Sequence, residues 1–210
     1  MNIVLIGIQG CGKGTLVAGL EKHLDFSLVS AGQLLRDEVA TGSELGQRIK
    51  SLQDKGILVD FDIVMSLLNK KLNENDKPIM IFDGFPRNKE QAEGIDKILN
   101  IDLVIYLNLP KEVAVSRIVN RLTCLKCGYI TKKQDVTTDV CVKCGGKLAQ
   151  RSDDTIEAVN KRFEIYEKDT YPLIERYKAR GVVAEIDANR TPNEVLEDVM
   201  KVINERNNQR

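Results

Sequence analysis

The first fifteen residues, MNIVLIGIQGCGKGT, restrict the possible folds of this chain more than any other stretch. The apolar run over residues 2–6 predicts a β-strand, the glycine-rich segment over residues 7–14 predicts a tight turn, and residues 16–24 predict a helix. In such a unit, the backbone N–H groups of the turn and the positive end of the helix can surround a phosphate group. The sequence therefore predicts a phosphate-binding loop after an N-terminal strand.

The spacing of the residues in this turn supports the same interpretation. Gly7, Gly12 and Lys13 fit the GxxxxGK(S/T) pattern of phosphate loops. Gly14 stands where the hydroxyl residue usually comes, and Thr15 follows it. Lys13 would add a full positive charge to the partial charge of the helix terminus. The alternative, a flexible turn with a surface lysine, does not explain why the segment directly follows a strand.

Apolar strands alternate with helices along the rest of the chain. Short apolar runs predict four more strands, at residues 26–29, 78–82, 102–109 and 182–186. Helical periodicity and capping residues predict the helices, at residues 32–40, 43–55, 61–72, 88–99, 110–122, 154–178 and from 192 onward. This alternation predicts an α/β fold with three layers, α/β/α, in which helices cover both faces of a five-stranded parallel sheet.

Polar and glycine-containing segments follow several of the expected strands. They occupy residues 7–13, 30–32 and 83–87. Ligands of parallel α/β sheets bind beyond the carboxyl ends of the strands. We therefore expect these three segments to lie along one edge of the sheet and to form a binding site there.

Four of the five cysteines lie in a short insert with the pattern Cys124-x2-Cys127-x13-Cys141-x2-Cys144, and a glycine follows each pair. This spacing is typical of a zinc ribbon, and in a cytosolic chain it favours a metal over disulfides. Four thiolates complete a tetrahedron and leave no open position, so the metal would be structural. The spacing leaves open whether the metal is zinc or iron.

The amino-acid composition limits the kinds of molecule that the protein is expected to bind. The 210 residues are 42% hydrophobic, and 31 basic residues balance 31 acidic ones, so no net charge attracts nucleic acid or a membrane surface. Aromatic residues make up only 5% of the chain, which offers no platform for stacking nucleic-acid bases. The sequence shows no long apolar run and no signal peptide. We expect a cytoplasmic enzyme that binds neither nucleic acid nor membrane, with a monomer as the default.

Five segments, in this order along residues 3 to 192, resemble the motifs of one known family: GIQGCGKGT, SAGQLLR, FDGFPR, RIVNRLTCLKCG and QRSDDTIEAVNKR. They are similar to the adenylate kinase family of P-loop nucleoside monophosphate kinases, in its long-lid form with a zinc-binding lid. The resemblance implies a core domain (residues 1–29, 60–122 and 151–210), an NMP-binding flap (30–59) and a zinc-binding lid (123–150). It also implies reversible, Mg²⁺-dependent phosphoryl transfer from ATP to AMP, giving two ADP.

The resemblance also assigns roles to individual residues. The residues implied in catalysis are Lys13, Arg87, Arg121, Arg151 and Arg162. Those implied in nucleotide binding are Gly10, Cys11, Gly12, Gly14, Thr15, Ala31, Arg36, Val59, Gly84, Gln91 and Arg117. Asp83 would hold Mg²⁺ through water, and the four cysteines of the insert would hold structural Zn²⁺. Arginine suits such a site because its planar fork pairs with phosphate oxygens and keeps its charge.

Several positions depart from the family pattern. Ala31 and Gln33 stand where a threonine and an aspartate are usual near the acceptor base, whereas Gln91 matches the glutamine that reads adenine. Thr131 and Lys132 stand where relatives carry Tyr-His on the donor side. A kinase that prefers UMP or CMP as acceptor, or GTP as donor, is therefore the nearest alternative. The alternative from another class of protein is a zinc-ribbon nucleic-acid-binding protein with a regulatory P-loop. A GTPase switch would need a hydroxyl residue directly after Lys13, where this sequence has Gly14.

Overall fold

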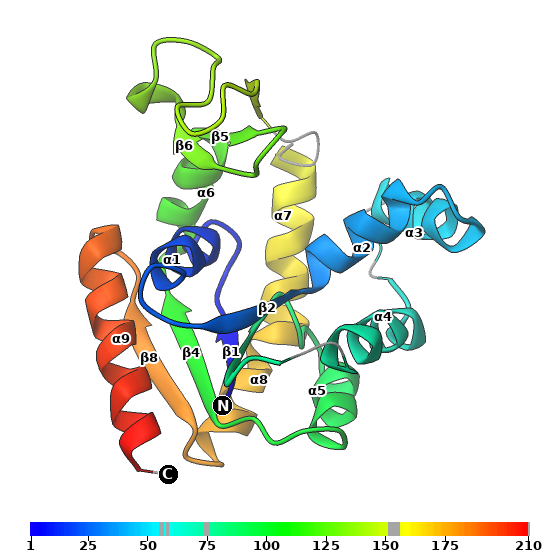
Figure 1. Ribbon diagram of the computed structural model, residues 1–210, viewed down its shortest axis with the longest axis vertical. Coiled ribbons are helices and arrows are strands. Elements are labelled where there is room, and N and C mark those ends of the chain that lie inside the picture. Colours follow the sequence, from blue (N-terminus) through cyan, green and yellow to red (C-terminus); the bar gives the residue numbers. More distant parts are fainter. Residues whose placement is uncertain (55–56, 58, 74–75, 151–155, 210) are drawn as a thin grey trace.

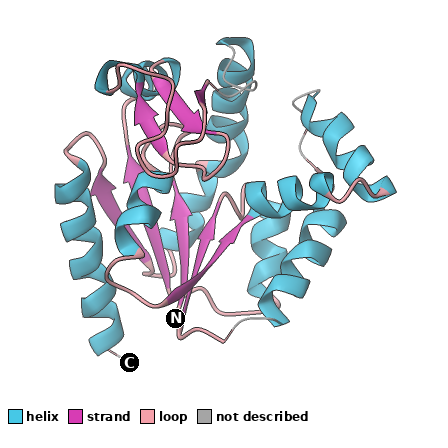
Figure 2. Cartoon of the chain, turned by 45° about the horizontal axis from the view of Figure 1, so that its top comes forward, coloured by secondary structure: helices cyan, strands magenta, loops and turns pink. Residues whose placement is uncertain are grey.

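The computed structural model describes residues 1–54, 57, 59–73, 76–150 and 156–209. Within these residues, five strands form one parallel sheet in the order β2-β3-β1-β4-β8 (Figure 1). The strands are β1 (Asn2–Ile6), β2 (Phe26–Ser30), β3 (Ile79–Asp83), β4 (Leu103–Asn108) and β8 (Val183–Asp187). Figure 2 shows their arrowheads pointing the same way. The predicted five-stranded parallel sheet is confirmed.

Alternate residues of the central strand β1 belong to two different hydrophobic cores. Ile3 and Leu5 lie in the core that α1 and α9 cover, whereas Val4 and Ile6 lie in the core that α4, α5 and α8 help to form. All four side chains are at most 2% exposed. A strand with both faces buried reads as a continuous apolar run, which explains why the sequence predicted it well. The three-layer α/β/α arrangement is thus confirmed.

Helices surround the sheet, and side chains cap several of them. Their bounds are α1 (Lys13–Leu20), α2 (Ala31–Ala40), α3 (Glu44–Asp54), α4 (Phe61–Asn73), α5 (Lys89–Asp96), α6 (Lys111–Val119), α7 (Ile156–Ile165), α8 (Pro172–Lys178) and α9 (Pro192–Asn208). Ser30 and Asn88 cap α2 and α5 through their side chains, and Thr191 forms a capping box with Glu194 at the start of α9. No helix in these described segments has the length and apolar character needed to cross a membrane.

Two predicted helices differ from the structure. The helix expected over residues 110–122 ends at Val119, and Arg121–Cys124 forms strand β5 instead. In the described part of the insert, β5 pairs with β6 (Ile130–Lys132) and β7 (Leu148–Ala149) in a small antiparallel sheet. The pairing partners lie beyond residue 122, so local helical periodicity could not reveal that the chain changes to a strand.

Pro172 predicts a bend in the helix expected over residues 154–178, and the structure interrupts that helix just before this proline. A π-helical segment, Tyr166–Thr170, separates α7 from α8, and the Tyr171 N–H donates to the Tyr166 carbonyl five residues back, at 2.7 Å. Pro172 has no N–H and its ring would collide with a carbonyl of a regular α-helix, so a wider turn relieves the conflict. Asp154, which the sequence predicts as the cap of this helix, lies outside the described residues.

The contact between α4 and α5 depends on a glycine. A Cβ atom added to Gly94 would lie 2.4 Å from Cζ of Phe61 and 2.7 Å from its Cε2. We expect Gly94→Ala to lower the free energy of unfolding by about 1–3 kcal/mol, because the packed Phe61 ring must shift to relieve the overlap. Urea unfolding measures this change. In a Phe61→Leu background the same substitution should cost clearly less, and an equal cost in both backgrounds would contradict this explanation.

Candidate functional site

The turn after β1 has the backbone geometry of a phosphate-binding loop. Gly10 and Gly12 have φ angles of 88° and 106°, which other L-residues rarely adopt. A Cβ atom on Gly10 would lie 2.8 Å from the carbonyl oxygen of Ala114, so the loop packs directly against α6. Helix α1 begins at Lys13, immediately after the loop. The N-terminal end of α1 therefore faces the space that the loop encloses, as the sequence predicted.

Lys13 folds back over the loop. Its Nζ donates to the carbonyl oxygens of Gly7 at 2.7 Å and Ile8 at 3.4 Å, and lies 3.4 Å from Sγ of Cys11. Cys11 is 2% exposed, and its own N–H donates to the Ile8 carbonyl at 3.1 Å. These carbonyls hold the ammonium group at the loop, where a bound phosphate would compete for it.

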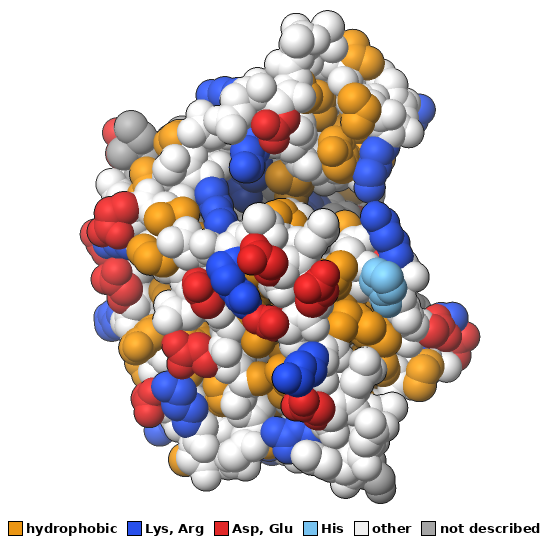
Figure 3. All heavy atoms as spheres, turned by 90° about the vertical axis from the view of Figure 1, so that its left-hand side faces the viewer, with side chains coloured by type: hydrophobic (Ala, Val, Ile, Leu, Met, Phe, Trp, Pro, Cys, Tyr) orange, Lys and Arg blue, Asp and Glu red, His pale blue; other side chains and the backbone are white. Residues whose placement is uncertain are grey.

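A second cation, Arg117 of α6, lies beside the same loop. Its Nη2 donates to the Ala188 carbonyl at 2.9 Å and its Nη1 to the Cys11 carbonyl at 3.4 Å. On another side, a Cβ atom on Gly14 would lie 3.3 Å from Cδ1 of Ile130, which belongs to β6 of the cysteine insert. The start of α1 thus lies between Arg117 and the insert. In Figure 3 the body of the protein and the upper lobe are separated by a hollow with basic side chains along it.

The loop after β3 lies next to the phosphate-binding loop. Strands β1 and β3 pair in parallel, and Asp83 is opposite Leu5, two residues before Gly7. Strand β2 pairs on the other side of β3, with Ser30 opposite Asp83. The three segments that the sequence placed at the strand ends therefore share one edge of the sheet, which confirms that expectation.

Hydrogen bonds hold Arg87 at this edge of the sheet. Its Nε donates to the Gly84 carbonyl at 2.8 Å, and its backbone N–H donates to Oε1 of Gln91 at 2.8 Å. Its carbonyl accepts a hydrogen bond from Oγ1 of Thr170 at 2.7 Å. Gln91 is 5% exposed and Thr170 is 8% exposed. Sequence reasoning did not find Thr170, because its partner is 83 residues away and no local pattern marks it.

Charged neighbours gather around the Arg87 guanidinium. The protein atoms packed around it desolvate the group and lower its pKa, although the residue as a whole keeps contact with solvent. The carboxylate of Asp83 opposes this effect and the positive charge of Arg162 adds to it. Both effects require proximity, so Asp83, Arg87 and Arg162 share one region. The pKa of arginine starts so high that the group stays charged.

The remaining expected nucleotide-binding residues occupy α2 and its surroundings. Arg36 is exposed and its Nη2 donates to Oε1 of Gln33 at 2.7 Å, while Nε2 of Gln33 donates to Asp37 at 2.6 Å. Ala31, the first residue of α2, and Val59 are 8% and 7% exposed. Of the residues implied in catalysis, Arg121 is the first residue of β5, at the entry to the insert. Arg151 lies outside the described residues.

The four cysteines of the insert meet in one cluster. Their sulfur atoms all lie within 4.8 Å of one another; Cys124 and Cys144 are 3.5 Å apart, and Cys127 and Cys141 are 3.7 Å apart. These separations are far longer than a disulfide bond. Zinc–sulfur bonds of about 2.3 Å in a tetrahedron place sulfur atoms roughly 3.8 Å apart. The cluster therefore fits a four-thiolate metal site.

The two cysteine pairs have the same backbone structure. The glycine after each pair has a φ angle near 70°, at 71° for Gly128 and 68° for Gly145. Its N–H donates to the carbonyl of the first cysteine of the pair, Cys124 at 3.0 Å and Cys141 at 2.9 Å. These two similar turns aim both pairs at one point, which is what a tetrahedral site requires.

The four thiols cannot all ionise easily without a cation. The backbone N–H of Cys127 stabilises the Cys124 thiolate and, despite burial, lowers its pKa to about 6. At Cys144 the N–H of Gly146 also favours the thiolate, but the Cys127 thiol and burial outweigh it and raise the pKa to about 12. A divalent metal removes this conflict because it neutralises the neighbouring thiolates.

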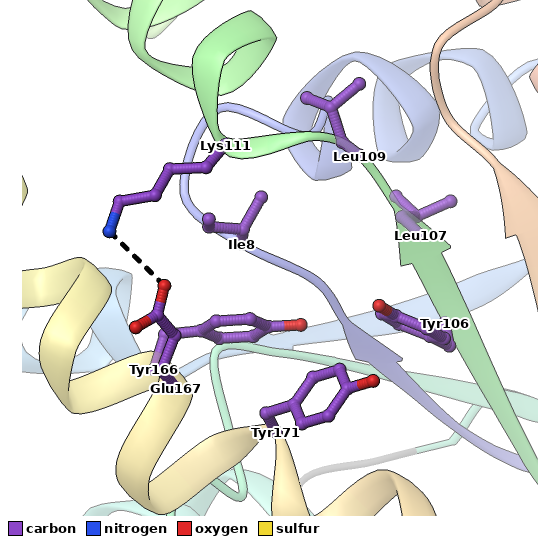
Figure 4. Close-up of a pocket in the computed structure, with 8 residues that line it drawn as sticks. All are labelled: Ile8, Tyr106, Leu107, Leu109, Lys111, Tyr166, Glu167 and Tyr171. Atoms are coloured by element: carbon purple, nitrogen blue, oxygen red, sulfur yellow. Dashed lines mark hydrogen bonds and ion pairs between the residues drawn. The ribbon is translucent and has the colours of Figure 1, made fainter.

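A separate cavity of about 180 Å³ lies beside the phosphate-binding loop, between the end of β4 and the π-helical segment (Figure 4). Figure 4 shows the rings of Tyr106, Tyr166 and Tyr171 facing one another across it, with Lys111 and Glu167 joined by a 3.3 Å ion pair at its rim. Burial, followed by the neighbouring Tyr106, raises the pKa of Tyr166 well above its usual range. Nucleotide sites are larger than this cavity.

A parallel α/β sheet, a glycine loop with its lysine after the first strand, and arginines around that loop define a P-loop nucleotide-binding enzyme. The family model described as adenylate kinase matches residues 5–182. The chain is 38% identical to the adenylate kinase of Caldanaerobacter subterraneus over 97% of this chain and 96% of that protein. It is 40% identical to the adenylate kinase of Methanosarcina mazei over 97% and 98%, and 37% identical to that of Clostridium tetani over 97% and 98%. The chain belongs to the adenylate kinase family, and it is therefore a nucleoside monophosphate kinase.

Proposed function

We propose that the protein catalyses reversible, Mg²⁺-dependent transfer of the terminal phosphoryl group of ATP to AMP, giving two ADP. The observation that carries this proposal is the pairing of β1 with β3, which sets the Lys13 loop beside the loop of Asp83 and Arg87. Phosphoryl transfer needs two phosphate groups held in line and their charge neutralised, with little proton chemistry. Two adjacent cationic loops meet that need.

On the donor side, we assign the phosphates of ATP to the loop after β1. Lys13 would leave the carbonyls of Gly7 and Ile8 to pair with the phosphates, and Arg117 would add a second charge. The nucleotide-binding residues Gly10, Cys11, Gly12, Gly14 and Thr15 line the loop and the first turn of α1. Asp83 stands at the end of β3, where it would hold Mg²⁺ through water. The metal would draw charge from the bridging phosphate oxygens.

On the acceptor side, we assign AMP to the segment between β2 and α5. Arg36 and Arg87 would pair with its phosphate, and Ala31, Val59 and Gly84 would contact the nucleoside. Since Oε1 of Gln91 accepts the Arg87 N–H, the carboxamide nitrogen is the end that would donate to the adenine edge. This link joins base recognition directly to the arginine that holds the phosphate.

We propose the division into a core (1–29, 60–122 and 151–210), an NMP-binding flap (30–59) and a zinc-binding lid (123–150). Arg121 and Arg151 flank the lid, and Arg162 on α7 neighbours Arg87. Closure of the lid would bring these arginines to the transferring group and exclude water. Structural Zn²⁺ on the four cysteines would keep the lid folded.

The experiment that tests this function is a panel of acceptors. With ATP and Mg²⁺, AMP should show a higher kcat/KM than GMP, CMP or UMP, and ADP alone should yield ATP and AMP. A higher value for UMP or CMP would replace the proposed acceptor, and faster turnover with GTP would replace the donor. Salt-dependent RNA binding without any turnover would favour the nucleic-acid alternative. A Lys13→Met sample serves as control for contaminating kinases of the expression host.

A further inference from the structure

Three hydrogen bonds among the described residues hold Arg87, and each uses a different part of it. The loop carbonyl of Gly84 accepts from the side chain, Gln91 accepts from the backbone N–H, and Thr170 donates to the carbonyl. The first two partners are local, within four residues of Arg87. Thr170 belongs to the π-helical segment, 83 residues further along the chain. It therefore ties the loop to the helices that cover the sheet.

Charges of opposite sign lie near the Arg87 guanidinium: Asp83 attracts it, and Arg162 repels it to a smaller extent. Arg162 lies on α7, one element before the π-helical segment, and its charge repels the Arg87 guanidinium. The same continuous stretch of chain thus repels the side chain of Arg87 through Arg162 and holds its backbone through Thr170. A cation kept in place before the anion arrives is pre-organised, which lowers the cost of binding.

We propose that Thr170 is a positioning residue for the acceptor phosphate, acting through Arg87. The inference rests on the proposed function, because it takes Arg87 to be the residue that holds the phosphate of AMP. The π-helical segment has a role in this assignment, since it carries Thr170 and is fixed by Pro172 two residues later. Loss of the Thr170 hydroxyl leaves the Arg87 carbonyl without this donor and frees the loop to shift.

The test compares Thr170→Val, which keeps the shape and removes the hydroxyl, with Thr170→Ser, which keeps the hydroxyl. The valine variant should raise the KM for AMP by about fivefold or more, the loss expected for one hydrogen bond, and leave the KM for ATP within about twofold. The serine variant should restore the KM for AMP. Thr191→Val is the control, because it also removes a threonine hydroxyl that donates a hydrogen bond, to Oε2 of Glu194 at 2.5 Å, but at the start of α9 and outside the proposed AMP-binding segment.

Each other outcome would overturn the inference. An unchanged KM for AMP in Thr170→Val would show that the hydroxyl does not position Arg87. Equal increases of both KM values, or a serine variant as impaired as the valine variant, would reduce Thr170 to a packing residue. Thermal unfolding of each variant shows whether the variant still folds. The KM for ATP shows whether its donor site is intact. The proposed function is tested separately, by the wild-type enzyme: it fails if the wild type does not use AMP as acceptor.

Discussion

Replacing Lys13 with methionine should lower kcat by about a thousandfold or more, the usual loss when a main charge-stabilising group leaves a transition state. Methionine is similar in length and flexibility but carries no charge. In the structure the ammonium group has the carbonyls of Gly7 and Ile8 as partners, at the loop where the donor phosphates would lie. Initial rates of ADP formation at saturating ATP and AMP measure the effect.

The control for this variant is Lys22→Met, which removes an exposed lysine just after the end of α1. Its rate should match that of the wild type within about twofold, because surface substitutions away from a site have small effects. Both variants should unfold near the wild-type temperature. If Lys13→Met kept a tenth of the wild-type kcat, the ammonium group could not be the one that stabilises the transferred charge.

The strands and the phosphate-binding loop could be predicted because their signals are local. β1 and β4 are buried on both faces, so each appears in the sequence as an unbroken apolar run. The positive φ angles of Gly10 and Gly12 can be expected from glycine in a tight turn between a strand and a helix. Parallel pairing then follows from the helices between strands, and it brings Asp83 beside the loop.

The features that the sequence did not predict depend on contacts between distant residues. Residues 121 and 122 continue a helical pattern, yet they form a strand because Lys132 and Thr131 pair with them. Tertiary pairing outweighs helix propensity there. Thr170 looks like any threonine of an amphipathic helix until the fold places Arg87 against it. The cysteine cluster is the reverse case, since its spacing alone predicted that the four sulfur atoms would meet.

Replacing Cys141 with serine should remove the lid metal and unfold the lid while the main sheet stays folded. Among the described residues, the buried core of the lid consists of Cys124, Cys141 and Leu148, so two of its three members are expected metal ligands. A segment with so little buried apolar area needs a bound metal to stay folded. Zinc content should fall from about one ion per chain to below roughly a tenth, and the unfolding temperature should fall as well. Elemental analysis measures the metal and also decides between zinc and iron.

Cys11→Ser provides the matched control, because Cys11 is also buried but lies in the phosphate-binding loop and not in the cluster. It should leave the metal content unchanged. Hydrogen exchange locates the damage in Cys141→Ser: the amides of β5 and β6 should lose protection, and those of β1 and β4 should keep it. Activity should fall with the lid, since Arg121 is the first residue of β5 and loses its position when the strand unfolds. A Cys141→Ser protein that keeps a full complement of metal would exclude the four-thiolate site and with it this account of how the lid holds its shape.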